Sequence, residues 1–295
     1  MSLTSFVEIK DVREKFNETF SKPKIGANVA LQFASQTKNY GLVGQGFDYL
    51  LRFYLQRIHP FATSTGWLAE AAIIVSKVPL TLKQEVFAQG IVKRAKAAFN
   101  QYQNDGNVNI ELAKSALCLA QLDLLFRPGI LVPNLGTPED ADVDDLIKLM
   151  SLVTPDLFQA REVCVLNPTF GVASRLVGGA DMDVVLDDML VEIKTTKGKI
   201  LERGHFNQLL GYYVLSRIAP IDGAPPKHKI NRLGVYSARY RQFYTINLKD
   251  IASESVFLNF TTWFEQRAKE GRSQVSDSSI PLVQSEQDST RPPTR

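Results

Sequence analysis

Apolar residues recur at three- and four-residue steps through most of the first 155 positions, which is the spacing of amphipathic helices. Clusters of Gly, Pro, Asn and Asp separate the periodic stretches. Acidic residues open the last stretch, as suits a helix N-terminus. The expected helices cover residues 46–58, 66–77, 82–103, 110–126 and 142–153. We therefore predict a mostly helical portion over residues 1–155.

After residue 155 the pattern changes to short apolar runs rich in Val, Ile, Leu and Tyr, which favour β-strands. The order is strand, hairpin, helix, strand, and it indicates an α/β fold with a small mixed sheet flanked by helices. These elements are expected at residues 162–171, 178–197, 204–218 and 231–248. We place the α/β unit at 156–268 and a polar, Pro-rich disordered tail at 269–295.

The composition is that of a folded soluble protein, with 44% hydrophobic and 22% charged residues among 295. The net charge of +3 is too small to establish a polyanionic partner. Cys118 and Cys164 lie in separate apolar stretches and are expected to be buried free thiols. We find no apolar signal sequence and no run of the ~20 apolar residues that cross a bilayer. The expectation is a cytoplasmic protein with no membrane partner.

The stretch GGADMDVVLDDMLVEIKTTK, residues 178–197, places charges inside the predicted hairpin. With a two-residue turn at Asp187 and Asp188, alternation sorts the side chains onto two faces. One face is entirely apolar and holds Met182, Val184, Leu186, Met189, Val191 and Ile193. The other holds Asp181, Asp183, Val185, Leu190, Glu192 and Lys194. This separation favours the register in which Asp183 faces Glu192 and Asp181 faces Lys194.

The charged face brings acidic groups together, because cross-strand Cβ atoms lie roughly 5 Å apart. Like charges placed opposite each other destabilise a sheet, so Asp183 and Glu192 require a cation between them. Lys194 supplies part of that charge. Mg²⁺, which binds carboxylate and phosphate oxygens, would supply more. The alternative is an ordinary outer face on which these residues form only surface ion pairs.

A second motif follows on the next predicted helix. Gln208 and Tyr212 are four residues apart and therefore lie on one helical face. Taken alone, such a pair is more often a surface amide beside a half-buried tyrosine. Here it comes eleven residues after the end of the hairpin stretch, on the helix that leaves it.

In this order the motifs resemble the core of the PD-(D/E)xK nuclease superfamily, and in particular its RecB-type branch. Asp181, the triplet Glu192-Ile193-Lys194 and the Gln208–Tyr212 pair carry the resemblance, which covers roughly residues 160–250. Gly178 leads Asp181 as in the glycine-x-x-aspartate motif of that branch. The resemblance implies a restriction-endonuclease-like core in which Gln208 and Tyr212 support the site or contact substrate.

The resemblance also implies roles for the hairpin residues. Asp181 and Glu192 are catalytic and bind Mg²⁺ or Mn²⁺, helped by the backbone carbonyl of Ile193. Lys194 is the third catalytic residue, which orients or activates the attacking water and stabilises charge on the phosphate. Asp183 is an additional acid, and it is either a neighbour of Asp181, a second ligand, or the ligand in its place.

An upstream metal ligand is also implied. RecB-type members usually carry a histidine four residues after a glycine on an early helix. Asp48 stands at that distance from Gly44, and an aspartate can bind the same ion. Glu70 is the rival, since other branches use a glutamate, and either residue can instead be a solvated helix position. His59, His205 and His228 have no partner at ligand spacing and are interpreted as incidental. His205 opens the motif helix and is the one expected nearest to substrate.

Basic residues follow the hairpin and are interleaved with aromatic ones, a combination that binds phosphates and stacks on bases. The basic residues are Lys197, Lys199, Arg203, Lys227, Lys229, Arg232, Arg239 and Arg241. The aromatic residues are Tyr236, Tyr240, Phe243 and Tyr244. We expect Lys197 near substrate, and alternation places Arg239 and Arg241 on one face. An ordinary Tyr-rich strand with outward arginines is the alternative.

Together these features predict a metal-dependent nuclease that hydrolyses nucleic-acid phosphodiester bonds, with DNA favoured over RNA. The alternative is a non-catalytic nucleic-acid-binding or interaction module on the same fold, and the helical portion is a candidate surface for a protein partner. No G-x-x-x-x-G-K-[ST] loop is present, so nothing indicates use of ATP.

Overall fold

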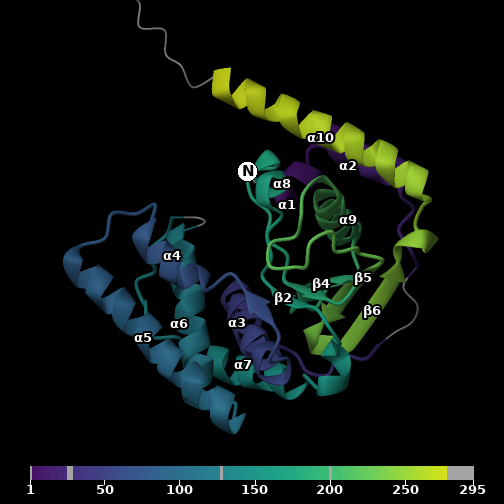
Figure 1. Cartoon of the computed structure of the whole chain (residues 1–295). Helices are drawn as coiled ribbons and strands as arrows, with labels where there is room; N and C mark the ends of the chain where they lie inside the picture. The colour runs from purple at the N-terminus through teal and green to yellow at the C-terminus, as the bar shows by residue number, and fades with distance from the viewer. Residues whose placement is uncertain (1, 25–28, 127–128, 199–200, 278–295) are drawn as a thin grey trace, which may run out of the picture.

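The computed structural model describes residues 2–24, 29–126, 129–198 and 201–277. The fold is mixed α/β, with a six-stranded mixed sheet flanked by helices (Figure 1). The strands are β1 (Thr63–Ser64), β2 (Cys164–Leu166), β3 (Val184–Leu186), β4 (Met189–Lys194), β5 (Arg232–Ser237) and β6 (Gln242–Asn247). They lie side by side in chain order. The pairs β1–β2 and β4–β5 are parallel, and the other pairs are antiparallel. The predicted mixed sheet is confirmed, and β1 adds a short strand from the helical portion.

The hairpin of β3 and β4 has the predicted register around its turn. Val184 pairs with Val191 and Leu186 with Met189, and Asp187 in the turn takes the left-handed conformation with φ 47°. The pairing stops at Val184, because the preceding chain turns towards the loop after β2. There the backbone carbonyl of Asp183 accepts a hydrogen bond from Asn167, and Asp181 bridges to Thr169. The predicted ladder pairs of Asp183 with Glu192 and of Asp181 with Lys194 are therefore wrong.

Helices from the first half of the chain form a group that shares a buried core with one face of the sheet. These are α3 (Tyr40–Ile58), α4 (Leu68–Ile74), α5 (Leu82–Asp105), α6 (Ile110–Phe126) and α7 (Asp140–Ser151), at or near their predicted positions. Val184, Leu186, Met189 and Val191 of the predicted apolar face share a buried core with them. Helix α6 is buried on almost every side, and apolar residues accordingly occupy all of its sides rather than one face.

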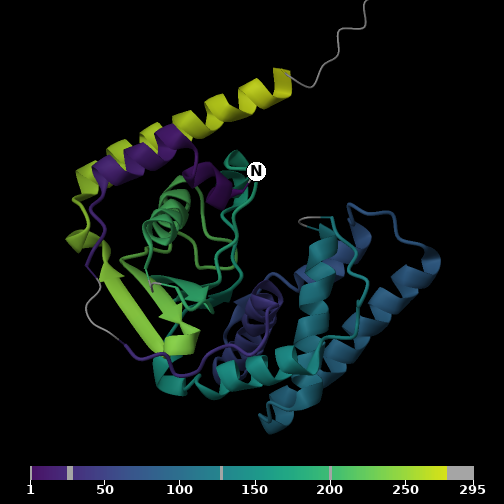
Figure 2. The same cartoon turned by 180° about the vertical axis from the view of Figure 1, so that it is seen from behind.

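The other face packs against helices from both ends of the chain. They are α1 (Leu3–Val7), α2 (Lys10–Thr19), α8 (Gly171–Leu176), α9 (Arg203–Ile218) and α10 (Glu254–Asp277). Phe16 and Phe20 contact Phe257 and Phe260, and α2 lies along α10 (Figure 2). The helical portion of the chain thus contributes to both faces. Short 3₁₀ turns occupy Pro155–Phe158, Ala238–Tyr240 and Leu248–Asp250.

Helix α10 includes the first residues of the predicted disordered tail, from 269 to 277, and the rest of that tail lies outside the described residues. Cys118 and Cys164 are buried free thiols, as predicted, and burial raises their pKa values to about 11 and about 12. Within the described ranges, no helix is both long and apolar enough to span a membrane.

Candidate functional site

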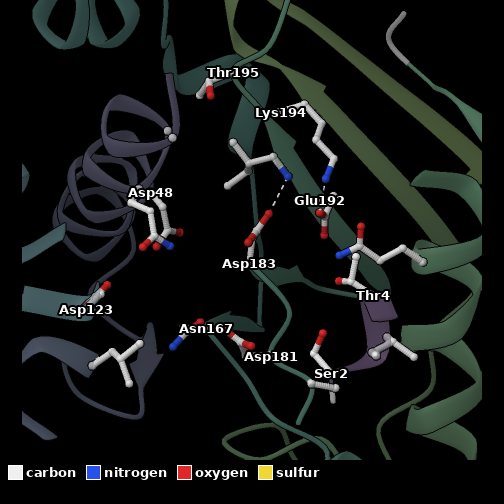
Figure 3. A pocket seen from close by; sticks show the side chains of 18 of the residues that line it. Ser2, Thr4, Asp48, Asp123, Asn167, Asp181, Asp183, Glu192, Lys194 and Thr195 are labelled. Carbon is white, nitrogen blue, oxygen red and sulfur yellow. Dashed lines mark hydrogen bonds and ion pairs between the residues drawn. The ribbon is translucent and has the colours of Figure 1, made fainter. Parts of the chain in front are cut away.

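A pocket of about 410 Å³ lies between α3, the end of β4, α9 and the first turn of α1 (Figure 3). Its charged lining residues are Asp48, Arg52, Asp123, Asp181, Asp183, Glu192 and Lys194. Gln208, Tyr212 and Ile193 complete the set of motif residues at this pocket. The structure therefore brings together the motif residues that the sequence singles out, although the ladder pairs proposed for them are not formed.

Glu192 and Lys194 lie two residues apart on β4, so both side chains leave the same side of the strand. Their side chains form an ion pair with 2.6 Å between Lys194 Nζ and Glu192 Oε1. Glu192 is only 6% exposed, and its Oε2 is buried without a hydrogen bond from any described residue. This oxygen therefore has unused hydrogen-bonding capacity.

The charge state of Lys194 follows from its partner. Burial alone would lower the pKa of Lys194, but the charge and the hydrogen bond of Glu192 outweigh this effect and raise that pKa above its ordinary value. Lys194 is therefore an ammonium group at neutral pH. Such a group donates hydrogen bonds and stabilises negative charge, but it does not accept a proton from water.

Asp183 sits beside the same strand. Its Oδ2 accepts a 2.6 Å hydrogen bond from the backbone N–H of Ile193. Burial, and then the negative charges of Glu192 and Asp48, raise the pKa of Asp183 well above its ordinary value. Three carboxylates from α3, β4 and the segment before β3 thus repel one another, and a cation among them would lower the free energy of the group.

Asp181 reaches the pocket from a loop that requires glycine. Gly178 and Gly179 have φ values of 82° and 131°, which other residues rarely adopt. The carbonyl of Gly179 accepts a 2.8 Å hydrogen bond from the backbone N–H of Leu3, so the start of α1 holds this loop in place. The glycines that lead Asp181 are accounted for by this backbone geometry.

Gln208 and Tyr212 meet on one face of α9, as predicted. Gln208 Nε2 donates a 3.1 Å hydrogen bond to the Tyr212 hydroxyl oxygen. Burial raises the pKa of Tyr212, and the nearby charges of Glu192, Asp183 and Asp181 raise it further. The Tyr212 phenol therefore lies close to the three hairpin acids and remains protonated.

Of the two candidate upstream acids, the structure brings Asp48 to the pocket. Glu70 lies elsewhere on α4 and pairs with Lys96 at 2.8 Å, where both side chains are exposed. Asp48 Oδ2 pairs with Arg52 Nη2 at 2.6 Å, and the Arg52 guanidinium lies 4.4 Å from the centre of the Tyr49 ring. A Cβ at Gly44 would come 2.9 Å from Thr195 Oγ1, so the glycine allows α3 to approach the end of β4.

Two charged residues of the pocket do not belong to any predicted motif. Arg52 is 5% exposed, and its i, i+4 spacing from Asp48 on a predicted helix is the signal that could have revealed it. Asp123 on α6 is 4% exposed and accepts a 2.8 Å hydrogen bond from the Tyr49 hydroxyl. A lone aspartate inside an apolar helix is the sequence signal for Asp123.

The basic residues that follow the hairpin, predicted to form a patch with the aromatic ones, do not gather around this pocket. Arg239 is 1% exposed and forms a buried ion pair with Asp145, whereas Arg241 is exposed and has φ 49°. The prediction that they share a face is wrong, because β5 ends at Ser237 and a 3₁₀ turn follows. Arg203 donates to backbone carbonyls at the end of α2, and Arg232 pairs with Asp188.

Of the remaining members of the patch, Lys197 stays close to the pocket. Its Nζ lies 5.9 Å from the centre of the Tyr40 ring, and Tyr40 lines the pocket. Tyr236 is fully buried in the core, and Lys199 lies outside the described residues. Contact with nucleic acid through the patch as a whole is therefore not supported.

The histidines have separate environments. His59 Nε2 is 2.7 Å from the Phe158 carbonyl, and His228 Nε2 is 2.6 Å from the Asp187 carbonyl. Both are used in structural hydrogen bonds. Burial, and then the charge of Lys194, lower the pKa of His205, which places this side chain near the pocket but in its neutral form.

The donor set suits a hard cation, since Mg²⁺ prefers carboxylate oxygens and Glu192 Oε2 is buried without a partner. Among the residues described, however, no three His, Cys, Asp or Glu side chains are close enough together to hold a metal ion. The pocket thus contains oxygen donors of the type that a hard cation prefers, but Glu192 and Asp48 are paired with Lys194 and Arg52.

No family model, no curated protein and no solved structure matches this chain.

Proposed function

We propose that this protein is a metal-dependent nuclease that hydrolyses phosphodiester bonds, with DNA favoured over RNA, on a restriction-endonuclease-like core of the PD-(D/E)xK type. The observation that carries the proposal is the pocket itself. Asp181, Asp183, Glu192 and Lys194 line one hollow, where a buried carboxylate oxygen of Glu192 has no hydrogen-bond partner among the described residues.

Asp181 and Glu192 would hold Mg²⁺ or Mn²⁺, together with the backbone carbonyl of Ile193. Asp183 and Asp48 are further oxygen donors at the same pocket. When bound, the ion supplies a nucleophilic water at neutral pH and neutralises charge that develops on the phosphate. Asp183 already accepts a hydrogen bond from Ile193, so one of its oxygens is engaged.

The protein's own groups contribute charge and orientation. Lys194, as an ammonium, would donate hydrogen bonds to phosphate oxygens and stabilise negative charge that develops during the reaction. Tyr212, protonated and hydrogen-bonded to Gln208, is a neutral donor facing the hairpin acids. Arg52 holds Asp48 in a fixed position through their ion pair.

One observation favours the alternative of a non-catalytic nucleic-acid-binding or interaction module. Lys194 and Arg52 already compensate Glu192 and Asp48, so the pocket is partly neutralised without a metal. The nuclease and the binding module differ in their requirement for metal. A binding module would hold DNA equally well in EDTA, whereas a nuclease would cleave only with a divalent ion.

The test is cleavage of labelled DNA, single- and double-stranded, linear and circular, with Mg²⁺, Mn²⁺ or EDTA, and with RNA in parallel. We expect metal-dependent cleavage by the wild type and a loss of at least about 100-fold in Lys194→Ala and Glu192→Gln. Lys83→Ala and Glu162→Gln are matched controls, since both side chains are exposed outside the pocket. The proposal fails if no nucleic acid is cleaved, or if the pocket variants cleave like the controls.

A further inference from the structure

A second hollow of about 450 Å³ adjoins the pocket that contains Glu192 and Lys194, which we call the acidic pocket. The residues that line both are Leu68, Asn167, Gly179, Ala180 and Asp181. The shared residues lie at one end of the acidic pocket. Figure 3 shows Asp181 and Asn167 at this end and Thr195 at the other. A chain molecule that left the acidic pocket at this end would pass Asp181 and reach the second hollow.

The two hollows differ in chemistry. The acidic pocket is lined by carboxylates with Arg52 and Lys194, whereas Trp67, Ala71 and Phe126 contribute apolar surface to the second hollow. Trp67 and Phe126 are partly exposed and Ala71 is exposed, so part of this apolar surface faces solvent. The second hollow thus adds apolar and aromatic contacts to the charges of Asp181, Asp222 and Arg175 that also line it.

The polar groups of the second hollow are mostly engaged within the protein. The Ser174 hydroxyl accepts a hydrogen bond from Phe170 and donates one to Ala180, and Thr169 donates to Asp222. Arg175 is exposed at this hollow and forms no ion pair with any described residue. Its guanidinium is therefore available to a phosphate.

A nucleic-acid strand also alternates between charge and apolar surface, because each charged phosphate is followed by a base whose flat faces are apolar. We propose that the second hollow binds the nucleobase next to the scissile phosphate, with Arg175 contacting the following phosphate. This subsite rests on the proposed nuclease function. A hollow of this size takes a small ligand. A base can occupy it only when it is unstacked and unpaired, so the substrate is single-stranded where it crosses the site.

The test uses a fluorescent single-stranded oligodeoxynucleotide, the same sequence as a blunt duplex, and the duplex with single-stranded ends. Cleavage is measured with Mg²⁺, and binding is measured separately by anisotropy with Ca²⁺ in place of Mg²⁺. Ala71→Glu adds a carboxylate to the second hollow. Ala97→Glu is its control, because Ala97 is also an exposed helical alanine but lies on α5, outside both hollows.

We expect the single strand and the single-stranded ends to be cleaved about tenfold faster than the blunt duplex, because the duplex must first unstack a base. Ala71→Glu should weaken binding of the single strand and raise its KM by about tenfold, and Arg175→Ala should weaken binding several-fold. Ala97→Glu should match the wild type.

The subsite is overturned if the blunt duplex is cleaved as fast as the single strand, or if Ala71→Glu and Ala97→Glu bind the strand equally well. If the wild type cleaves nothing but Ala71→Glu still weakens strand binding relative to Ala97→Glu, the second hollow binds the strand but the nuclease proposal falls, and with it the place of the base beside a scissile phosphate. Binding and cleavage therefore separate the two claims.

Discussion

At the scale of single residues, regular elements hold the side chains of the pocket on shared sides. Two-residue spacing on a strand fixes Glu192 and Lys194 on one side, and four-residue spacing on a helix brings Gln208 to Tyr212. Arg239 shows where this reasoning ends. Alternation predicts that it shares a face with Arg241, but the strand stops two residues earlier and the guanidinium pairs with Asp145 on α7.

The charge of Asp183 is expected to lower the stability of the metal-free protein. Asp183→Asn keeps an acceptor for the Ile193 N–H and removes a negative charge that is buried beside Glu192 and Asp48. We predict that the variant gains about 1 kcal/mol or more in free energy of unfolding at pH 7 in EDTA. The measurement is urea unfolding of both proteins across the pH range.

The sign follows from the raised pKa of Asp183. In the unfolded chain Asp183 ionises near pH 3.8, whereas in the folded protein its pKa is higher. The free energy of unfolding of the wild type is therefore lowered progressively as the pH rises from about 3.8 towards the folded pKa. The stability difference between Asp183→Asn and the wild type should therefore vanish below about pH 4. A variant that is less stable than the wild type at pH 7 would contradict this account.

At the scale of elements, the sequence locates helices and strands better than it locates their ends. Helices α3, α5, α6, α7 and α9 are found because their apolar periodicity is long, whereas α8 is a six-residue turn of helix without a repeat. Before Val184 the chain leaves its pairing with β4, and the Asp183 carbonyl accepts a hydrogen bond from the backbone N–H of Asn167, a tertiary contact that no local pattern encodes.

The close approach of α3 to β4 gives a test of how elements position the site. Gly44→Ala would place a Cβ 2.9 Å from Thr195 Oγ1, so that Thr195 or α3 must move, and Asp48 lies on the next turn. Gly90→Ala on α5 is the control, where the nearest atom is Arg94 Nη1 at 3.8 Å. We predict that Gly90→Ala stabilises the protein by about 1 kcal/mol with unchanged cleavage.

Gly44→Ala should gain less stability than Gly90→Ala and lose cleavage activity several-fold, because the pocket walls shift. Thermal unfolding and the cleavage rate of the same samples provide both quantities. Identical behaviour of the two variants would mean that the approach at Gly44 does not position the site.

At the scale of the whole molecule, the helical portion and the sheet share one core. Val184, Leu186 and Val191 are buried against α3, α6 and α7, and the Arg239–Asp145 pair joins the end of β5 to α7 (Figure 1). The first twenty residues cover the opposite face together with α9 and α10. Sequence patterns place the change from helical periodicity to strand-like runs near residue 155. They contain no information about which faces of the sheet the helices cover.

A fragment of residues 156–277 should therefore not fold by itself. It would expose the apolar side chains that the earlier helices bury, at a cost of about 1.5–3 kcal/mol for each large one. We predict that the isolated fragment shows no cooperative thermal transition by circular dichroism, whereas the full chain does. A sharp transition in the fragment would show that the α/β unit is independent of the helices before it.

The central claim is that the pocket of Glu192 and its neighbours takes a divalent cation, and this can be measured without knowing the substrate. Mn²⁺ binding, followed by electron paramagnetic resonance of the free ion, compares the wild type, Glu192→Gln and the exposed control Glu162→Gln. The account predicts binding by the wild type and the control, and its loss or a weakening of at least about tenfold in Glu192→Gln. The account is contradicted if the wild type binds no Mn²⁺ or if Glu192→Gln binds it equally well.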